Sequence, residues 1–137
     1  MPRHFTPDEA NRLLARLGPM MQELVAQRRA LREQQEILAA FQAKAGGNGG
    51  VARGREVVAA RQAMDRITAQ LRQGLQDIQE LGCVVKDLDM GLLDFPAVRN
   101  GTEVYLCWRV GEERIDYWHG VDEGFAGRKP LDDSFQP

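Results

Sequence analysis

Apolar residues recur every seven positions through the first third of the chain. The repeat comprises Ala10, Leu17, Leu24, Leu31 and Leu38, and a second heptad position holds Leu14 and Met21. This spacing is typical of an amphipathic helix that packs along another helix. The pattern predicts a long helix over residues 7–43.

Two local signals refine this first helix. Thr6 is a suitable N-cap, Pro7 fits the first helical position, and Glu9 is placed to complete a capping box. Further along, Pro19 removes one backbone hydrogen bond and crowds the preceding turn, so we expect a kink near Leu17.

A second heptad pattern predicts a second helix over residues 55–81. Its two apolar positions are occupied by Val57, Met64, Leu71 and Ile78, and by Ala60, Ile67, Gly74 and Leu81. Between the two patterns, residues 45–54 include five glycines and predict a loop. The two helices should therefore form an antiparallel hairpin.

The apolar period changes from helical to alternating after Gly82, which predicts an antiparallel sheet over residues 83–119. Its clearest signal is Asn100-Gly101, a pair suited to a type I′ turn. A two-residue turn places Arg99 opposite Thr102. One face then carries the apolar pairs Ala97/Val104, Phe95/Leu106 and Leu93/Trp108, and the other carries Val98/Glu103, Pro96/Tyr105, Asp94/Cys107 and Leu92/Arg109. A slip by one residue would exchange the faces, so the pattern favours this register.

A further strand is predicted at residues 115–119, after a turn over residues 111–114. A four-residue loop sets Asp116 opposite Arg109. We prefer it to a two-residue loop, which would set Arg114 opposite Arg109 and so oppose two positive charges. His119 then lies near Leu106 at the end of the apolar face, where a neutral ring is favoured. With residues 120–137 as loop and tail, the sequence predicts a single α+β domain: a long antiparallel helical hairpin followed by a three- to four-stranded antiparallel meander.

Composition and charge limit the cellular compartments and the binding partners that we expect. The 137 residues are 43% hydrophobic with a formal net charge of −2, which does not favour nucleic-acid binding. The chain has no apolar run near the roughly 20 residues that span a bilayer. Two cysteines and no export signal indicate a cytoplasmic protein with reduced thiols.

One group of residues resembles a metal-binding set. His119, Asp122 and Glu123 follow one another closely and fall near Cys107 and Asp94 in the predicted sheet. Imidazole, thiolate and carboxylate together can bind zinc or iron. The alternative is a structural histidine at the end of the sheet beside two solvated loop carboxylates, and we expect this structural outcome. A divalent metal is the only cofactor that the sequence suggests.

Other candidates could bind a small ligand or anion. Asp94, Cys107, Arg109 and Asp116 lie on one predicted face, and Arg128 closes a loop with two glycines. A carboxylate raises the pKa of a neighbouring thiol, so Cys107 is a poor nucleophile. The favoured alternative is a structural polar layer of Asp94, Arg109 and Asp116 around a small buried Cys107, with an ordered loop in which Phe125 fills the core.

Several sequence blocks carry a family resemblance. They are Phe5-Thr6, Glu9-Ala10-Asn11, Leu13-Leu14, Gly91-Leu92-Leu93-Asp94-Phe95-Pro96-Ala97, Val104-Tyr105-Leu106-Cys107-Trp108, Trp118-His119 and Gly124-Phe125-Ala126-Gly127-Arg128. In these the chain resembles an uncharacterised bacterial family catalogued as domain of unknown function 2203. The resemblance implies no activity.

Two functions from different classes follow from these patterns. The first is a cytoplasmic module without catalysis that forms a homo-oligomer through its helical hairpin, since a helix of this length extends about 50 Å and a small sheet cannot cover it. The second is a metal- or anion-binding protein, with an enzyme as one possibility, that uses the acidic, cysteine and histidine side chains of the sheet.

Overall fold

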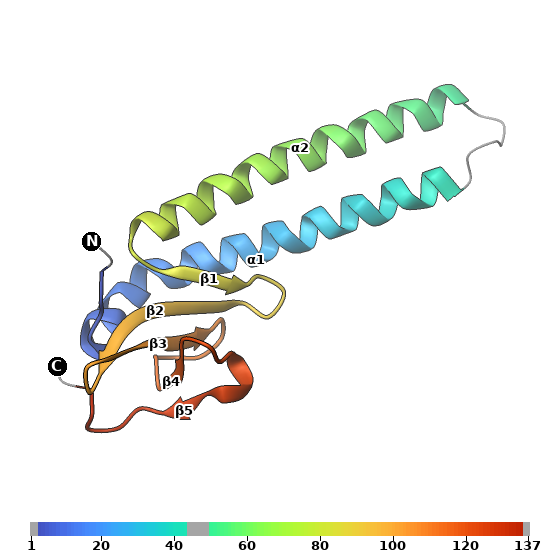
Figure 1. The fold of residues 1–137 in the computed structure, drawn as a ribbon. Helices are drawn as coiled ribbons and strands as arrows, with labels where there is room; N and C mark the ends of the chain where they lie inside the picture. The colour runs from blue at the N-terminus through green and yellow to red at the C-terminus, as the bar shows by residue number, and fades with distance from the viewer. Residues whose placement is uncertain (1–2, 44–49, 136–137) are drawn as a thin grey trace.

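Two long helices precede an antiparallel sheet in the computed structural model, which describes residues 3–43 and 50–135 (Figure 1). Helix α1 (Pro7–Ala43) and helix α2 (Gly50–Glu80) run side by side in opposite directions. The chain then forms β1 (Val84–Asp87), β2 (Leu92–Arg99), β3 (Thr102–Arg109), β4 (Tyr117–Gly120), the 3₁₀ helix η1 (Phe125–Gly127) and β5 (Lys129–Pro130). The predicted α+β architecture is confirmed.

The five strands form a simple meander in the order β1-β2-β3-β4-β5. The sequence predicted three or four strands and a loop over residues 120–137. The structure adds η1 and the two-residue β5, which pairs with β4 at Tyr117 and Trp118. A strand of two residues has no alternating pattern to detect, which explains why it was missed.

Helix α1 begins as predicted and continues through Pro19. The amide of Thr6 donates to Glu9 Oε1 at 3.0 Å, and the amide of Glu9 donates to Thr6 Oγ1 at 3.1 Å, which completes the capping box. Pro19 and Ala15 are both exposed. The carbonyl that Pro19 deprives of its helical partner therefore lies on the solvent side, where water can bind it.

Helix α2 begins earlier than the glycine content suggested. Residues 45–49 of the predicted loop lie outside the described part of the chain, whereas residues 50–54 are helical. The predicted start at Arg55 was therefore too late. Extending an existing helix needs no new nucleation, so each glycine adds a cost of only about 1 kcal/mol.

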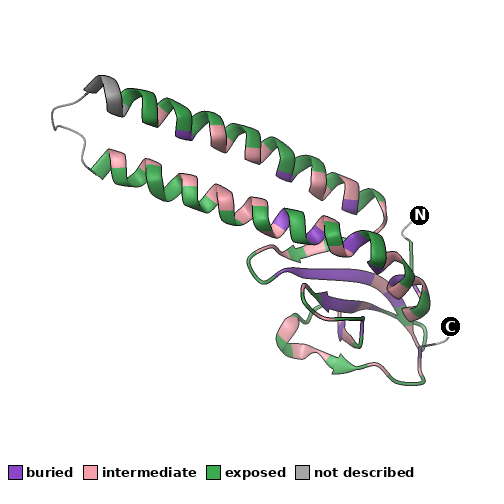
Figure 2. Cartoon of the chain, turned by 180° about the vertical axis from the view of Figure 1, so that it is seen from behind, coloured by how far each residue is buried: buried purple, intermediate pink, exposed green. Residues whose placement is uncertain are grey.

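The core lies between the first half of α1 and one face of the sheet. The buried residues of α1 are Ala10, Leu14, Leu17, Met21 and Leu24, and Figure 2 shows them gathered at the sheet end of the helix. They meet the alternating apolar residues of β2 and β3, among which Leu93, Phe95, Ala97 and Leu106 are fully buried. Beyond Leu24, the two helices continue past the sheet as a pair (Figure 1).

The predicted register between β2 and β3 is confirmed at all positions, from Leu92 opposite Arg109 to Arg99 opposite Thr102. Asn100 and Gly101 have φ values of 50° and 78°, as a type I′ turn requires. This hairpin positions the polar face of the sheet, which carries Asp94 and Cys107.

The predicted register between β3 and β4 is wrong by one residue. Strand β4 places Trp118 opposite Leu106 and His119 opposite Tyr105, so Trp118, and not His119, faces the helices. The connection is irregular: the amide of Ile115 donates to Asn11 Oδ1 at 2.8 Å, and the strand begins only at Tyr117. Because a shift of one residue exchanges the two faces, His119 joins the polar side of the sheet.

Candidate functional site

Three side chains from adjacent strands meet on the sheet face that points away from α1. Asp94 comes from β2, Cys107 from β3 and His119 from β4. One carboxylate oxygen, the thiol sulfur and one imidazole nitrogen all lie within 4.8 Å of one another. These side chains, called the Asp-Cys-His cluster below, are almost fully buried, with exposures of 1%, 1% and 2%.

The pairing of the strands brings the cluster together. Asp94 lies directly opposite Cys107, and His119 lies opposite Tyr105, two residues before Cys107 on the same strand. Residues two apart on a strand share a face, so all three side chains are on one side of the sheet. The imidazole lies against the Tyr105 ring, with 5.6 Å between ring centroids.

Hydrogen bonds fix the orientation of the imidazole. His119 Nδ1 lies 2.8 Å from the carbonyl oxygen of Gly120, which can only accept, so Nδ1 carries a proton. His119 Nε2 lies 3.0 and 3.1 Å from the two carboxylate oxygens of Asp94. In neutral imidazole with a protonated Nδ1, Nε2 is an acceptor. Nε2 and the carboxylate therefore need a shared proton or another cation between them.

Burial changes the acidity of the other two members. Desolvation is the main cause that raises the pKa of Asp94, and His119 opposes it as the largest lowering influence. Burial, with the charge of Asp94 as second cause, raises the pKa of Cys107 to about 12. Cys107 is therefore a protonated thiol when no cation binds it, and as the sequence indicated it is a poor nucleophile.

Arg128 covers part of this face. Its guanidinium donates to the carbonyl oxygen of Cys107 at 3.2 Å, pairs with Glu112, and stacks 4.2 Å from the centroid of the Tyr117 ring. The centroid of the Phe125 ring lies 4.8 Å from the same guanidinium. In the loop that the sequence suggested as an anion site, Arg128 therefore binds other residues of the same chain.

The remaining predicted site residues lie elsewhere. Asp122 is exposed, and Glu123 accepts from the amide of Gly120 and from Lys129 Nζ, both at 2.8 Å. Neither belongs to the Asp-Cys-His cluster.

The predicted polar layer of Asp94, Arg109 and Asp116 is not formed. Asp116 pairs with Arg114 at 3.0 Å, and Arg109 donates to the carbonyl oxygen of Met90 at 3.3 Å. The reason is the shifted register of β4, which moves Asp116 out of line with Arg109 and brings His119 to Asp94 instead.

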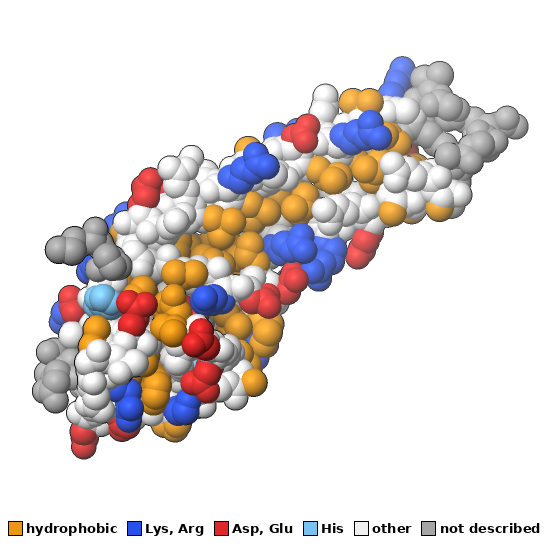
Figure 3. Space-filling model, viewed as in Figure 1, with side chains coloured by type: hydrophobic (Ala, Val, Ile, Leu, Met, Phe, Trp, Pro, Cys, Tyr) orange, Lys and Arg blue, Asp and Glu red, His pale blue; other side chains and the backbone are white. Residues whose placement is uncertain are grey.

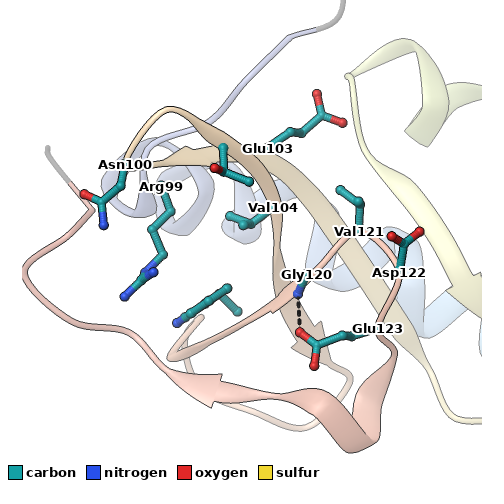
Figure 4. Close-up of a pocket in the computed structure, with 10 residues that line it drawn as sticks. Arg99, Asn100, Glu103, Val104, Gly120, Val121, Asp122 and Glu123 are labelled. Carbon is teal, nitrogen blue, oxygen red and sulfur yellow. Dashed lines mark hydrogen bonds between the residues drawn. The ribbon is translucent and has the colours of Figure 1, made fainter.

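A neighbouring pocket at the end of the sheet is separate from the cluster. Figure 4 shows Arg99 and Glu123 on different sides of this pocket, with the bond from Gly120 to Glu123 dashed. Its lining includes Trp118 and Val104 but none of the three cluster residues. Arg99 stacks 4.5 Å from the Trp118 ring and pairs with Asp132 at 3.2 Å, so its charge is already balanced.

Sequence reasoning missed two neighbours of the cluster. Tyr105 stacks on His119, and Lys86 Nζ lies 4.8 Å from the centroid of the Tyr105 ring. The period of two along β3 links Tyr105 to Cys107 and was available in the sequence. Lys86 could not be placed, because the pairing of β1 with β2 is irregular between Val85 and Asp87.

Fold and site together define an α+β protein in which a helical hairpin covers one face of an antiparallel meander and the other face holds a buried Asp-Cys-His cluster. The chain belongs to the family described as Uncharacterized conserved protein (DUF2203), whose model matches residues 3–131, and the predicted resemblance is confirmed. Comparisons with curated proteins and with solved structures found no match. No helix among the described residues is long and apolar enough to cross a membrane.

Proposed function

We propose that the protein is an interaction module without catalysis that pairs with a second copy of itself through the far end of its helical hairpin. This far end, called the arm below, consists of residues 31–43 of α1 and 54–67 of α2. One observation carries the proposal: all buried residues of α1 precede the arm, although its heptad pattern continues.

The arm leaves apolar surface in contact with solvent. The small heptad residue Ala60 is buried, but the larger apolar side chains of the arm are only half-buried, namely Leu31, Leu38, Phe41, Val57, Met64 and Ile67. Ile37 and Val58 are 43% and 53% exposed. Figure 3 shows hydrophobic side chains gathered along the junction of the two helices, where no sheet covers them. Two helices alone provide no third layer to bury this stripe.

A second copy is the occupant that the arm fits best. Two hairpins that stack face to face form a four-helix bundle, in which each buries the stripe of the other. The α1 part of the arm carries one arginine and two glutamates, and the α2 part carries three arginines and two acidic residues. The arm is therefore formally neutral, and α1 of one copy is complementary in charge to α2 of the other.

A reducing, cytoplasmic setting is part of the proposal. Cys83 and Cys107 are both buried and unpaired, which is the usual state of cysteines where thiols are kept reduced.

Sedimentation equilibrium and light scattering at micromolar concentration test the proposal. We expect a dimer for the unchanged protein, and at least a tenfold weaker dimer, equivalent to about 1.4 kcal/mol, for Ile37→Lys and for Val58→Lys. Both side chains are exposed in the single chain, so these variants should keep the helix content of the unchanged protein by circular dichroism.

Val98→Lys and Val121→Lys are matched controls, because these valines are similarly exposed, at 47% and 44%, but lie outside the arm. They should leave the dimer intact. A strictly monomeric unchanged protein would contradict the proposal, and so would a dimer that is weakened only by the two control variants.

A further inference from the structure

The Asp-Cys-His cluster has the composition of a metal site. Each member supplies a different donor: oxygen from Asp94, sulfur from Cys107 and nitrogen from His119. The three donors come from three adjacent strands of a hydrogen-bonded sheet, so their backbones are held rigidly. Sites on rigid elements hold ligands more precisely than sites on loops.

The bond from His119 Nδ1 to the Gly120 carbonyl, at 2.8 Å, prepares Nε2 as a ligand. Metal-binding histidines almost always donate the other ring N–H to a carboxylate or a backbone carbonyl, which fixes the tautomer and the orientation of the ring. Here the carbonyl belongs to the residue that follows the histidine, and Nε2 faces the carboxylate of Asp94.

The space between Nε2 and Asp94 requires positive charge. A lone pair on Nε2 and a carboxylate at 3.0 Å repel each other unless a cation lies between them. Burial of all three side chains keeps water from screening that repulsion. A proton meets this requirement in the metal-free protein, and a divalent metal ion meets it while also using the sulfur of Cys107.

The donor set selects the class of metal. Thiolate and imidazole suit zinc and other transition metals, whereas magnesium and calcium prefer oxygen ligands only. Zinc binds nitrogen at about 2.0–2.1 Å and sulfur at about 2.3 Å, so two donors of one ion lie roughly 3.5 Å apart. Donor atoms that already lie within 4.8 Å of one another need shifts of only about 1 Å.

We propose that Asp94, Cys107 and His119 bind one divalent transition-metal ion of the zinc class within the sheet. Three protein ligands leave the fourth tetrahedral position to water or to an added ligand. Binding converts the Cys107 thiol to a thiolate, so it releases protons to solvent. The site is independent of the arm, and a monomeric protein would bind the metal equally well.

The chain offers a matched control for two of the three ligands. It has two cysteines and two histidines, and one of each lies outside the cluster. Cys83 is buried in the apolar core, and His4 pairs with Glu103 near the N-terminus. Variants at Cys83 and His4 therefore remove the same chemical groups without removing a proposed ligand.

The first measurement needs no variant. Protein purified without a histidine tag and stripped with a chelator is titrated with Zn²⁺ alone in a calorimeter, and with Co²⁺ alone in a spectrophotometer. We expect one ion per chain, release of protons to the buffer, and a thiolate-to-cobalt charge-transfer band. Absence of saturable binding to the folded protein would overturn the proposal.

The variants then identify the ligands. Cys107→Ser should abolish the charge-transfer band, and His119→Ala and Asp94→Ala should each weaken Zn²⁺ binding by tenfold or more. Cys83→Ser and His4→Ala should bind as the unchanged protein does. Unchanged binding in Cys107→Ser and His119→Ala, or loss of binding only in His4→Ala, would place the ion elsewhere and refute the site. If a cluster variant fails to fold, the cobalt spectrum of the unchanged protein still decides whether a thiolate binds the ion.

Discussion

The contact between Asp94 and His119 joins the two polar or charged residues that are buried in the described part of the molecule. Both side chains are almost fully buried, and each carboxylate oxygen faces the same imidazole nitrogen. A buried polar group that loses its partner costs much more free energy than an exposed one. In a variant of Asp94, the stability of the sheet should therefore depend on whether the new side chain can still pair with His119.

In the metal-free protein, Asp94→Asn should destabilise much less than Asp94→Leu. The asparagine amide can donate to Nε2 of a neutral imidazole, whereas leucine leaves Nε2 buried without a partner. We expect a loss of about 3–5 kcal/mol in the free energy of unfolding for leucine and about 1 kcal/mol for asparagine. Urea denaturation with chelator present measures both, and equal losses would show that the bond contributes nothing specific.

Acid should weaken the fold through two carboxylates at the ends of the chain. Hydrogen bonds from Thr6 lower the pKa of Glu9, and hydrogen bonds from Ser134 lower the pKa of Asp132. A carboxylate whose pKa is lower in the folded state stabilises the fold above its unfolded pKa, and this contribution is lost as the pH falls through the folded pKa. The loss should therefore begin below the ordinary values of 4.5 and 3.8.

Urea midpoints measured from pH 6 downward test this dependence. Glu9→Gln and Asp132→Asn should each be less stable at pH 6 and should each flatten the acid side of the curve. Asp133→Asn, next to Asp132, controls for the removal of one negative charge. Curves for Glu9→Gln and Asp132→Asn that run parallel to that of the unchanged protein would contradict the assignment.

At the scale of elements, the connection between two strands determines whether their register can be predicted from the local sequence. Asn100 and Gly101 join β2 to β3 with two residues of positive φ, so the hairpin register follows from turn chemistry. The connection from β3 to β4 depends on long-range bonds, such as the one from Ile115 to Asn11 on α1. No local pattern specifies such a bond, and the predicted register failed there.

Two glycine-to-alanine changes should have opposite effects. Gly101 has a φ of 78°, which costs an alanine about 1–2 kcal/mol. Gly54 lies inside α2, is not followed by a proline and has nothing within 4 Å of an added Cβ, so Gly54→Ala should stabilise by about 0.5–1 kcal/mol. Thermal and urea unfolding measure both changes, and a stabilising Gly101→Ala would contradict the described turn.

At the scale of the whole molecule, most of the arm lies outside the core of the sheet. The buried core residues of the helices extend up to Leu24 in α1 and from Leu71 onward in α2, and of the arm only Leu31 and Ile67 are among the partly buried residues packed against this core. Close approach of the helices is visible at Gly74, where an added Cβ would lie 2.5 Å from Leu24 Cδ2. The arm lies further along the two helices than this contact, on the side away from the sheet.

Replacing residues 35–63 with a short polar turn should leave the sheet folded. Both tryptophans, Trp108 and Trp118, lie in the sheet, so the near-ultraviolet circular dichroism should keep its shape. The shortened chain should be monomeric and should unfold with a smaller denaturant slope, because less surface becomes exposed. Loss of the tryptophan signal would show that the arm is needed for the core.

The sequence by itself determined the elements whose signals are local. The heptads of Leu17, Leu24 and their repeats specified the helices, and Asn100-Gly101 with the alternation of Phe95 and Ala97 specified one hairpin and its faces. These signals depend on neighbours a few residues away, so they can be recognised without the rest of the chain.

Only the tertiary structure decided the position of β4 and therefore the composition of the site. The sequence named Asp94, Cys107 and His119 among its candidates but assigned His119 to the apolar face, with Asp122 and Glu123 beside it. Trp118 has the larger apolar surface, and it packs against the core with Phe135 at 5.9 Å between ring centroids. That contact joins β4 to the C-terminal segment and puts His119 against Asp94, because alternate residues of a strand must face opposite sides.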